Sequence, residues 1–331
     1  MGDVLVTTPL IYGLKKAFPN SKITVGVGDW SSSLLENNRD IDEIISLNGP
    51  WHNKQNCYFP ANSLLTFIFG LLYVLFSREA RCLTKQNFTV GIDVLGSRQG
   101  CWLLRRAGIP NRFGVKGYAG GHKWCKKNIE FSENKNVAKS ALSFLPLLGS
   151  NIQIEPRPRI FLTERETKDA VSHWNISTKK FKRIVVAPGG GFPEKCWGDR
   201  NFSSLIITLL KEKELKIFVV GNHDDERRIN LIENERLKNF CGKLNLRESA
   251  AIISQSEFVI TNSSLSMHLA GAFKIPSLTL LGDWYGSAKS HRIQWGYDEG
   301  VVLGKEISEG KRNIPSVNTA VELIKERLLL N

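Results

Sequence analysis

Three consecutive glycines with a lysine shortly after them form the most chemically suggestive segment of the sequence. A predicted strand over residues 183–187 runs into the turn Pro188–Gly191, and Lys195 follows. Glycine has no Cβ, so the backbone N–H groups of such a turn can approach phosphate oxygens closely. A plain turn would have the same sequence, and both interpretations are open. Lys195 favours diphosphate binding, because an ammonium group can neutralise a departing nucleoside diphosphate.

Hydroxyl side chains and a histidine follow a second predicted strand, over residues 258–261. Ser263, Ser264 and His268 lie where this strand passes into a predicted helix over 264–273. In open α/β sheets ligands bind at this end of the strands, and hydroxyl groups there can donate to a phosphate. In the alternative interpretation, Ser263 or Ser264 only caps the helix and His268 is a hydrogen-bonded core histidine.

A carboxylate, Asp3, stands just before the first predicted helix. It can complement the positive end of the helix dipole, which is worth a few tenths to about 1 kcal/mol. It can instead act as a general base if a substrate hydroxyl comes within hydrogen-bond reach. The sequence by itself leaves both roles open.

The elements that must position these groups alternate along the chain. We expect strands over 22–27, 43–47, 89–95, 183–187, 216–221, 258–261 and 277–281, and helices over 10–18, 31–37, 99–107, 202–211, 225–234, 264–273 and 317–330. Such alternation is typical of parallel α/β folds. A polar segment with prolines, 149–158, suits an interdomain linker. With 331 residues the chain is long enough for two domains, which we place at 1–152 and 153–331.

The charge of the chain predicts an anionic partner. The formal net charge is +13, and residues 51–127 contain twelve basic and two acidic side chains, so that they contribute +10 of it. Nucleic acid has no support beyond charge, because the sequence has no zinc-finger spacing, basic heptad helix or ribonucleoprotein motif. Anionic lipid headgroups and phosphorylated sugars fit the same charge.

An apolar run over residues 64–76 predicts a helix of unusual composition. Such a helix is about 20 Å long at 1.5 Å per residue, too short for a hydrocarbon core of roughly 30 Å. We prefer the interpretation of a buried core helix. The alternative is an interfacial helix that dips into a membrane surface beside the basic region.

The six cysteines show no CxxC or Cys/His metal spacing. We therefore expect reduced, structural thiols, no metal site and no cofactor. The first ten residues do not have the order of charge, apolar stretch and cleavage site that a secretory signal needs. A cytoplasmic protein is the expectation.

Several ordered segments resemble glycosyltransferase family 9, the family of the ADP-heptose:lipopolysaccharide heptosyltransferases. The segments are Gly2–Leu10, Ile92 to Gly114, Gly189–Trp197, Cys241–Glu248 and Thr261–Ala270. The resemblance runs across nearly the whole chain. It implies a GT-B fold, in which two Rossmann-like domains face each other across a cleft. The N-terminal domain would then bind mainly the acceptor and the C-terminal domain mainly the nucleotide sugar.

The same resemblance implies inverting transfer without a required metal. It makes Asp3 the catalytic base that deprotonates the acceptor hydroxyl. Lys195 would contact the donor phosphates, and Gly190 and Gly191 would supply backbone amides.

Five further residues are implied as candidate donor contacts. Ser263, Ser264 and His268 match the second donor-binding loop of the family, and Asp225 or Glu226 is placed at the nucleoside ribose.

The implied reaction transfers a heptose from ADP-heptose to the Kdo-bearing lipid A of the lipopolysaccharide inner core. The implied partners are a nucleotide sugar, an anionic glycolipid and the surface of the inner membrane, with the protein peripheral on its inner face and no nucleic acid bound. The alternatives are a family 9 transferase that uses another nucleotide sugar, and a catalytically degenerate, membrane-associated binding protein of the same fold.

Two departures from the family pattern qualify this picture. Ser263 and Leu265 stand where many relatives have an aspartate and a glycine. We expect this difference to affect which donor sugar is accepted. Relatives also have a strand of about ten residues before the Gly-Asp pair. We therefore expect that the sequence lacks its first strand.

Overall fold

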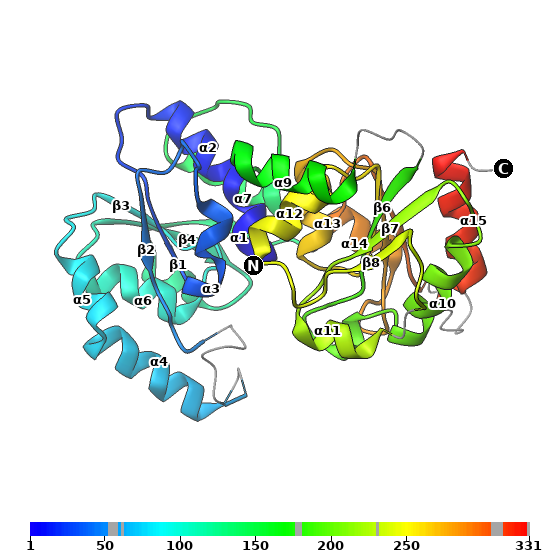
Figure 1. The fold of residues 1–331 in the computed structure, drawn as a ribbon. Coiled ribbons are helices and arrows are strands. Elements are labelled where there is room, and N and C mark those ends of the chain that lie inside the picture. The colour runs from blue at the N-terminus through cyan, green and yellow to red at the C-terminus, as the bar shows by residue number, and fades with distance from the viewer. Residues whose placement is uncertain (52–58, 61–62, 176–180, 230–231, 306–313, 330–331) are drawn as a thin grey trace. The chain divides into compact units, whose positions relative to one another are not determined.

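The computed structural model describes residues 1–51, 59–60, 63–175, 181–229, 232–305 and 314–329. Helices and strands alternate through these residues, as predicted (Figure 1). The chain divides into two compact units, which we call the first unit (residues 3–156 with Met1) and the second unit (residues 157–331 with Gly2). Residues 150–163, between the units, contain neither helix nor strand.

The elements of the two units are as follows, with α1 given under the first unit although its first residue, Gly2, is grouped with the second. The first unit contains α1 (Gly2–Val6), α2 (Thr8–Ala17), β1 (Thr24–Val27), α3 (Asp29–Ser32), η1 (Ser33–Leu35), β2 (Glu43–Ser46), α4 (Leu64–Phe76), α5 (Arg78–Thr84), β3 (Val90–Ile92), α6 (Arg98–Arg106), β4 (Asn111–Lys116), η2 (Gly121–Trp124), β5 (Lys127–Glu130), α7 (Val137–Leu142) and α8 (Phe144–Leu147). The second unit contains α9 (Glu164–Trp174), β6 (Lys182–Ala187), η3 (Pro193–Lys195), α10 (Asp199–Leu209), β7 (Leu215–Val219), α11 (His223–Arg228), β8 (Leu237–Asn239), α12 (Leu246–Ser254), β9 (Phe258–Thr261), α13 (Leu265–Ala272), β10 (Ser277–Leu280), α14 (Ala288–Trp295), β11 (Gly300–Leu303) and α15 (Val317–Leu328).

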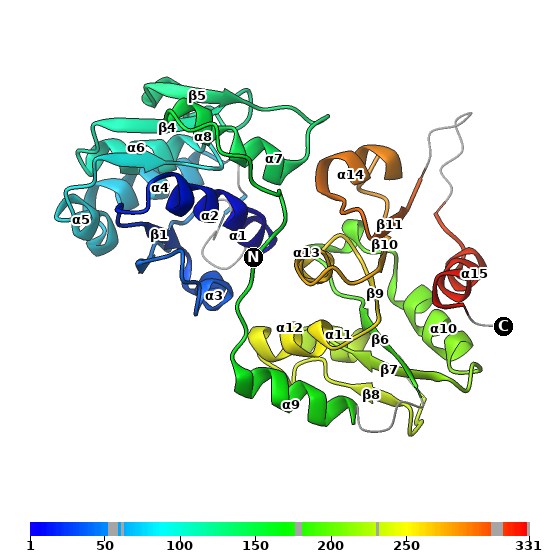
Figure 2. The same cartoon turned by 90° about the horizontal axis from the view of Figure 1, so that it is seen from above.

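The second unit is built on a parallel sheet of six strands in the order β11-β10-β9-β6-β7-β8. Its central strands β6 and β9 are apolar over most of their length, as expected for a parallel sheet covered on both faces. Ile184 and Val186 of β6 are fully buried in the core beneath α10 and α15. On the other side of the sheet Trp174 of α9 stacks on Phe218 of β7 with ring centroids 3.6 Å apart. Figure 2 shows the helices on both sides of the sheet.

The first unit contains two smaller parallel sheets, β1-β2 and β3-β4-β5. Leu10 of α2 packs with Phe113 of β4 and Phe144 of α8 in one core cluster. After β3, the half-buried Asp93 carboxylate accepts hydrogen bonds from the N–H groups of Leu95 and Gly96 and so forms the turn into α6. The prediction of a missing first strand stays a prediction.

Two predicted elements match the structure at both ends, and several extend too far, among them the strand predicted over 89–95, since β3 ends at Ile92. The strand over 258–261 is β9 and the helix over 64–76 is α4. The helix predicted over 225–234 is wrong at its C-terminal end, because α11 ends at Arg228. The reason is that Ile229 takes an extended backbone conformation and buries its side chain in the core of the sheet. Leu330, the predicted end of the last helix, lies outside the described residues.

The preferred interpretation of residues 64–76 as a buried core helix is wrong. Only Thr66, Gly70 and Val74 of α4 are buried, and these three residues form a narrow stripe at i, i+4 and i+8. Most large apolar side chains of the helix are exposed. Within the residues that the model describes, no helix combines the length and the apolarity needed to cross a membrane.

Two cysteines that are distant in the sequence meet in the first unit. The Sγ atoms of Cys101 on α6 and Cys125 after η2 lie 3.3 Å apart, next to Asp93. Sequence spacing did not predict this pair, because the contact depends on how η2 packs against α6. Cys57 lies outside the described residues.

Candidate functional site

The strand order of the second unit creates a switch point at the carboxyl ends of its strands. From β6 the chain runs outward through β7 to β8, then returns to the other side of β6 and continues through β9, β10 and β11 (Figure 2). The loops that follow β6 and β9 therefore leave the same edge in opposite directions. Ligands of open α/β sheets bind at such a switch point, outside the carboxyl ends of the strands.

Asn262 joins the loops on the two sides of this switch point. Its side chain is fully buried. Its Oδ1 accepts a hydrogen bond from the backbone N–H of Trp197 at 2.9 Å, and its Nδ2 donates to the carbonyl of Pro188. Sequence analysis did not single out Asn262 as a site residue. The available signal was an amide side chain directly after a largely apolar strand.

The glycine turn after β6 packs against α11. Asp225 is only 4% exposed, and its carboxylate accepts from the N–H of Asn222 at 2.8 Å, which completes the capping box of that helix. A Cβ at position 189 would collide with this carboxylate, so Gly189 is required by close packing. Gly190 is half-buried and Gly191 is exposed, so the backbone of the turn borders solvent.

The two residues predicted at the ribose differ in accessibility. The Asp225 carboxylate is committed to the start of α11, whereas Glu226 is half-buried and lies 3.3 Å from the ammonium of Lys243. Of the two, Glu226 is better placed to reach a ligand. The ribose contact itself stays a prediction.

Lys195 ends the short helix η3, and its ammonium group lies over two aromatic rings. The Nζ atom is 4.9 Å from the ring centroid of Phe192 and 5.7 Å from that of Tyr285. The loop after β10 fixes this arrangement, because the N–H of Gly282 donates to the carbonyl of Lys195 at 3.2 Å. The two aromatic rings hold the ammonium group through cation–π contacts.

Ser263 is the centre of a hydrogen-bond network that sequence analysis did not foresee. The hydroxyl of Tyr285 donates to Ser263 Oγ at 2.8 Å, and Oγ lies 2.8 Å from Nε2 of His291. Burial, reinforced by nearby His268 and Lys195, lowers the pKa of His291 to about 3, so the ring is neutral at pH 7. A neutral imidazole carries one N–H, so the hydrogen bond between Oγ and Nε2 can run in either direction according to the tautomer. Tyr285 and His291 come from the next loop and from α14, and no motif spacing points to them.

The interpretation of Ser263 or Ser264 as a helix cap is wrong. Ser264 is the N-cap residue of α13, but its side chain makes no capping hydrogen bond. Its Oγ lies 3.0 Å from Oγ1 of Thr261, and Ser263 is engaged with Tyr285. Both hydroxyls are therefore held by side chains at the carboxyl ends of the strands.

His268 is a buried, hydrogen-bonded histidine on α13. Its Nδ1 lies 2.7 Å from the hydroxyl of Tyr297, and burial lowers its pKa to about 3. The interpretation of His268 as a hydrogen-bonded core histidine is thus confirmed for its Nδ1 atom. A contact of this residue with the donor stays a prediction.

The remaining predicted residue, Asp3, belongs to the first unit. It lies in the first turn of α1 and is exposed. One edge of the second unit holds the turn at 189–191, Lys195, Ser263 and Ser264. Asp3 lies in the first unit. Its role as a base stays a prediction.

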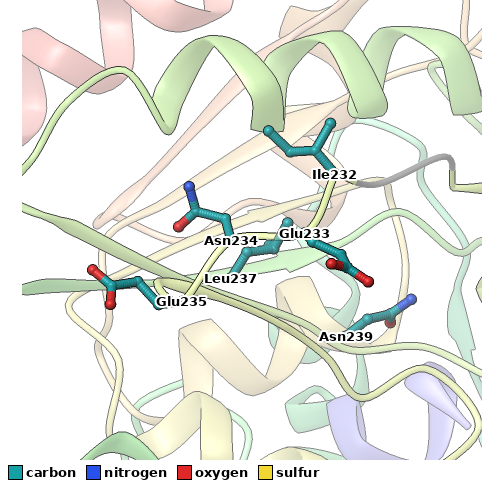
Figure 3. Close-up of a pocket in the computed structure, with 6 residues that line it drawn as sticks. All are labelled: Ile232, Glu233, Asn234, Glu235, Leu237 and Asn239. Atoms are coloured by element: carbon teal, nitrogen blue, oxygen red, sulfur yellow. The ribbon is translucent and has the colours of Figure 1, made fainter.

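A surface hollow elsewhere in the second unit offers different chemistry. It has a volume of about 530 Å³ and is lined by Ile232, Glu233, Asn234, Glu235, Leu237 and Asn239 (Figure 3). None of the predicted site residues lines it, and its two carboxylates would repel a diphosphate. Among the residues described by the model, no three His, Cys, Asp or Glu side chains are grouped to hold a metal ion.

Comparison with known proteins gives a consistent result. The model of glycosyltransferase family 9 (heptosyltransferase) matches residues 77–308. Lipopolysaccharide heptosyltransferase 3 of Escherichia coli is 23% identical over 288 residues, which are 85% of this chain and 80% of that protein. Lipooligosaccharide heptosyltransferase 2 of Haemophilus influenzae is 24% identical over 305 residues, which are 85% of this chain and 80% of that protein.

Solved structures of similar proteins show the fold. The E. coli ADP-heptose lipopolysaccharide heptosyltransferase II superposes with a TM-score of 0.74 at 18% identity, covering 99% of this chain and 96% of that one. The E. coli heptosyltransferase WaaC with ADP superposes with a TM-score of 0.70 at 15% identity, covering 99% of this chain and 95% of that one. The predicted GT-B fold is confirmed.

Proposed function

Because the chain belongs to glycosyltransferase family 9, we propose that it transfers a heptose from ADP-heptose to the lipopolysaccharide inner core. The observation that carries this proposal is the pair of loops joined by Asn262, with Lys195 beside them, at the switch point of the second unit. Such an edge suits a nucleoside diphosphate, because it offers backbone amides, hydroxyl groups and one cation together. The similar WaaC structures with ADP and with a fluorinated ADP-heptose support the choice of donor.

In the proposed reaction Asp3 accepts the proton of an acceptor hydroxyl. The hydroxyl oxygen then attacks the anomeric carbon of the heptose with inversion, and the bond from that carbon to the diphosphate oxygen breaks. The electron pair of this bond leaves with ADP. Lys195 and the amides of Gly190 and Gly191 stabilise the negative charge on the leaving diphosphate.

Ser263, Ser264 and His268 hold the donor on the other side of the switch point. Ser263 Oγ forms a hydrogen bond with a sugar or ribose hydroxyl, and Glu226 or Asp225 binds the ribose. The acceptor is a Kdo-bearing, anionic glycolipid, and the +10 charge of residues 51–127 supports that choice. The enzyme then works from the inner face of the inner membrane, on its surface.

A family 9 transferase with another nucleotide sugar is the second candidate. The observation that favours it is the uncharged network of Ser263, Tyr285 and His291 at a position where many relatives have an aspartate. A neutral acceptor selects a different pattern of sugar hydroxyls from a carboxylate.

Transfer from a panel of nucleotide sugars to a Kdo₂-lipid A acceptor tests the proposal. At an effective dielectric constant of 20, a cation about 4 Å from one phosphate charge contributes about 4 kcal/mol. Lys195→Met should therefore lower kcat by roughly 10²–10³-fold, and Asp3→Asn by roughly 10²–10⁴-fold. Matched controls are Lys168→Met and Asp169→Asn, two exposed residues of α9, which should retain wild-type rates. Full activity in either site variant would remove the assigned role, and turnover only with another sugar would establish the second candidate.

A further inference from the structure

Helix α4 presents a continuous apolar face to solvent. Seven large side chains on it are between 39% and 72% exposed: Leu64, Leu65, Ile68, Phe69, Leu72, Leu75 and Phe76. At 100° per residue they fall within an arc of about 140° of the helix circumference, so they form one surface. Patches of this kind on a folded protein mark an interaction site.

The opposite side of α4 packs against the first unit, which explains why the apolar face is exposed to solvent. The buried stripe of Thr66, Gly70 and Val74 faces the rest of the first unit, where α4 packs against α5 and α6 (Figure 1). A Cβ at Gly70 would touch Gln99 of α6, which shows how closely the two helices approach. The helix is therefore anchored by its small and polar residues and turns its largest apolar residues outward.

Exposed basic residues accompany this face. They lie on α5 and α6, the two helices that contact α4, and they are Arg78, Arg81, Arg98, Arg105 and Arg106, with Lys85 directly after α5. Arg81 donates to the carbonyl of Phe76 at 3.0 Å, which places one guanidinium at the C-terminal end of the apolar face.

The two acidic residues between Leu64 and Arg106 do not offset this charge at the surface. Glu79 accepts hydrogen bonds from the N–H and the side-chain amide of Asn48 at 2.9 Å, and also from the Tyr73 hydroxyl. Asp93 is engaged in the turn before α6. The outward charge of these helices is positive.

We propose that the exposed face of α4 binds the surface of a phospholipid bilayer that contains anionic headgroups. The helix lies in the plane of the interface, with Phe69, Leu72 and Phe76 among the acyl chains and the guanidinium groups of α5 and α6 at the headgroups. An apolar face flanked by Lys and Arg is the composition of interfacial helices. At about 20 Å the helix is too short to cross the bilayer and suited to lying on it.

A second copy of the chain fits this surface less well. A symmetric dimer through α4 would bring the same patch of each copy together. The basic residues of α5 and α6 would then face one another across the apolar contact, where like charges repel. An anionic surface instead matches both the apolar area and the charge around it.

The proposal rests on the proposed function only for the reason why the protein meets a membrane. Vesicle binding needs neither donor nor acceptor. A negative result in the transfer assay therefore does not contradict membrane binding by α4, and a negative result in the vesicle assay does not contradict the transfer reaction.

Co-sedimentation of the full-length chain with vesicles tests the surface. Wild-type protein should bind phosphatidylglycerol-containing vesicles more tightly than pure phosphatidylcholine vesicles, and added salt should weaken binding. Phe69→Glu/Leu72→Glu should weaken binding by more than roughly tenfold. The matched control Val171→Glu/Ile207→Glu changes two similarly exposed apolar residues of the second unit and should bind as wild type.

A charge variant tests the proposal independently of the apolar face. Arg78→Gln/Lys85→Gln should weaken binding to anionic vesicles roughly tenfold, whereas Lys168→Gln/Lys211→Gln should not. Circular dichroism and the midpoint of urea unfolding check that each variant is folded. The proposal is overturned if wild-type protein does not sediment with anionic vesicles, or if Phe69→Glu/Leu72→Glu binds them as wild type. It is also overturned if ultracentrifugation shows a dimer that this variant dissociates while vesicles are not bound.

Discussion

Removal of the Asn262 side chain tests how the candidate site is held together. In Asn262→Ala, the N–H of Trp197 and the carbonyl of Pro188 lose their partners in a region that is almost fully buried. Each unsatisfied buried group costs about 1–3 kcal/mol. Some relief by water is expected in the space left behind, so we expect a total loss of about 2–4 kcal/mol in the free energy of unfolding of the second unit.

Asn262→Asp separates the two hydrogen bonds. The aspartate oxygen can still accept from the Trp197 N–H, but a second carboxylate oxygen then faces the Pro188 carbonyl, and the two repel. Burial and this repulsion raise the pKa of the new carboxyl above its unfolded value of about 3.9. The destabilisation is therefore complete at neutral pH and decreases as the pH falls through the raised pKa, where the protonated group can donate to Pro188.

Urea unfolding followed by tryptophan fluorescence at pH 7 and pH 5 measures these changes, and calorimetry with ADP measures the effect on the loops. Asn201→Ala is the matched control, because its amide donates to the carbonyl of Trp197 at 2.8 Å and does not contact the glycine turn. It should cost about 1 kcal/mol or less and leave ADP affinity unchanged. The reasoning is refuted if Asn262→Ala unfolds at the wild-type urea concentration and binds ADP with wild-type affinity.

Two further predictions concern stability and thiol chemistry. Hydrogen bonds from Arg247 hold the pKa of Glu166 at about 2, below its ordinary 4.5, so Glu166 contributes stability above pH 4.5 that is lost as the pH falls toward 2. Because the pair is partly open to solvent, Glu166→Gln should unfold about 1–2 kcal/mol more easily than wild type at pH 6, and the difference should shrink at pH 3.5, as measured by urea unfolding. The thiol oxidant diamide should convert Cys101 and Cys125 into a disulfide with loss of two hydrogens, because their Sγ atoms are already 3.3 Å apart. Mass spectrometry after alkylation should show this product in wild type and in Cys82→Ser but not in Cys125→Ser, and equal alkylation of all thiols with and without diamide would contradict it.

The sequence was most informative where one local pattern decides the structure. β9 is apolar at its first three positions and is flanked by polar residues. Such a segment is typical of a parallel strand that is covered on both faces. The glycine turn was predicted at the carboxyl end of β6 because strand and turn are adjacent in the chain. The resemblance to family 9 then assigned the GT-B fold, which local patterns could not provide.

The features that the sequence did not reveal depend on contacts between distant segments. Tyr285 and His291 reach Ser263 only because β10 lies beside β9 in the sheet, and strand order is not written in either segment. The apolar run of α4 indicated a helix, but not which of its sides the first unit would cover. That choice was made by Gly70, whose small size permits the close approach to α6.

The position of β6 in the sheet also bears on how the protein is made. β6 has β7 on one side and β9 on the other, yet β7, α11, β8 and α12 must all leave the ribosome before β9 does. Until then one flank of a largely apolar strand has unpaired N–H and C=O groups, and such an exposed edge can pair with strands of other chains. Interrupted translation in this interval would release polypeptides that both lack the Asn262 link and tend to aggregate, so the steps between β8 and β9 are where the nascent chain most needs protection.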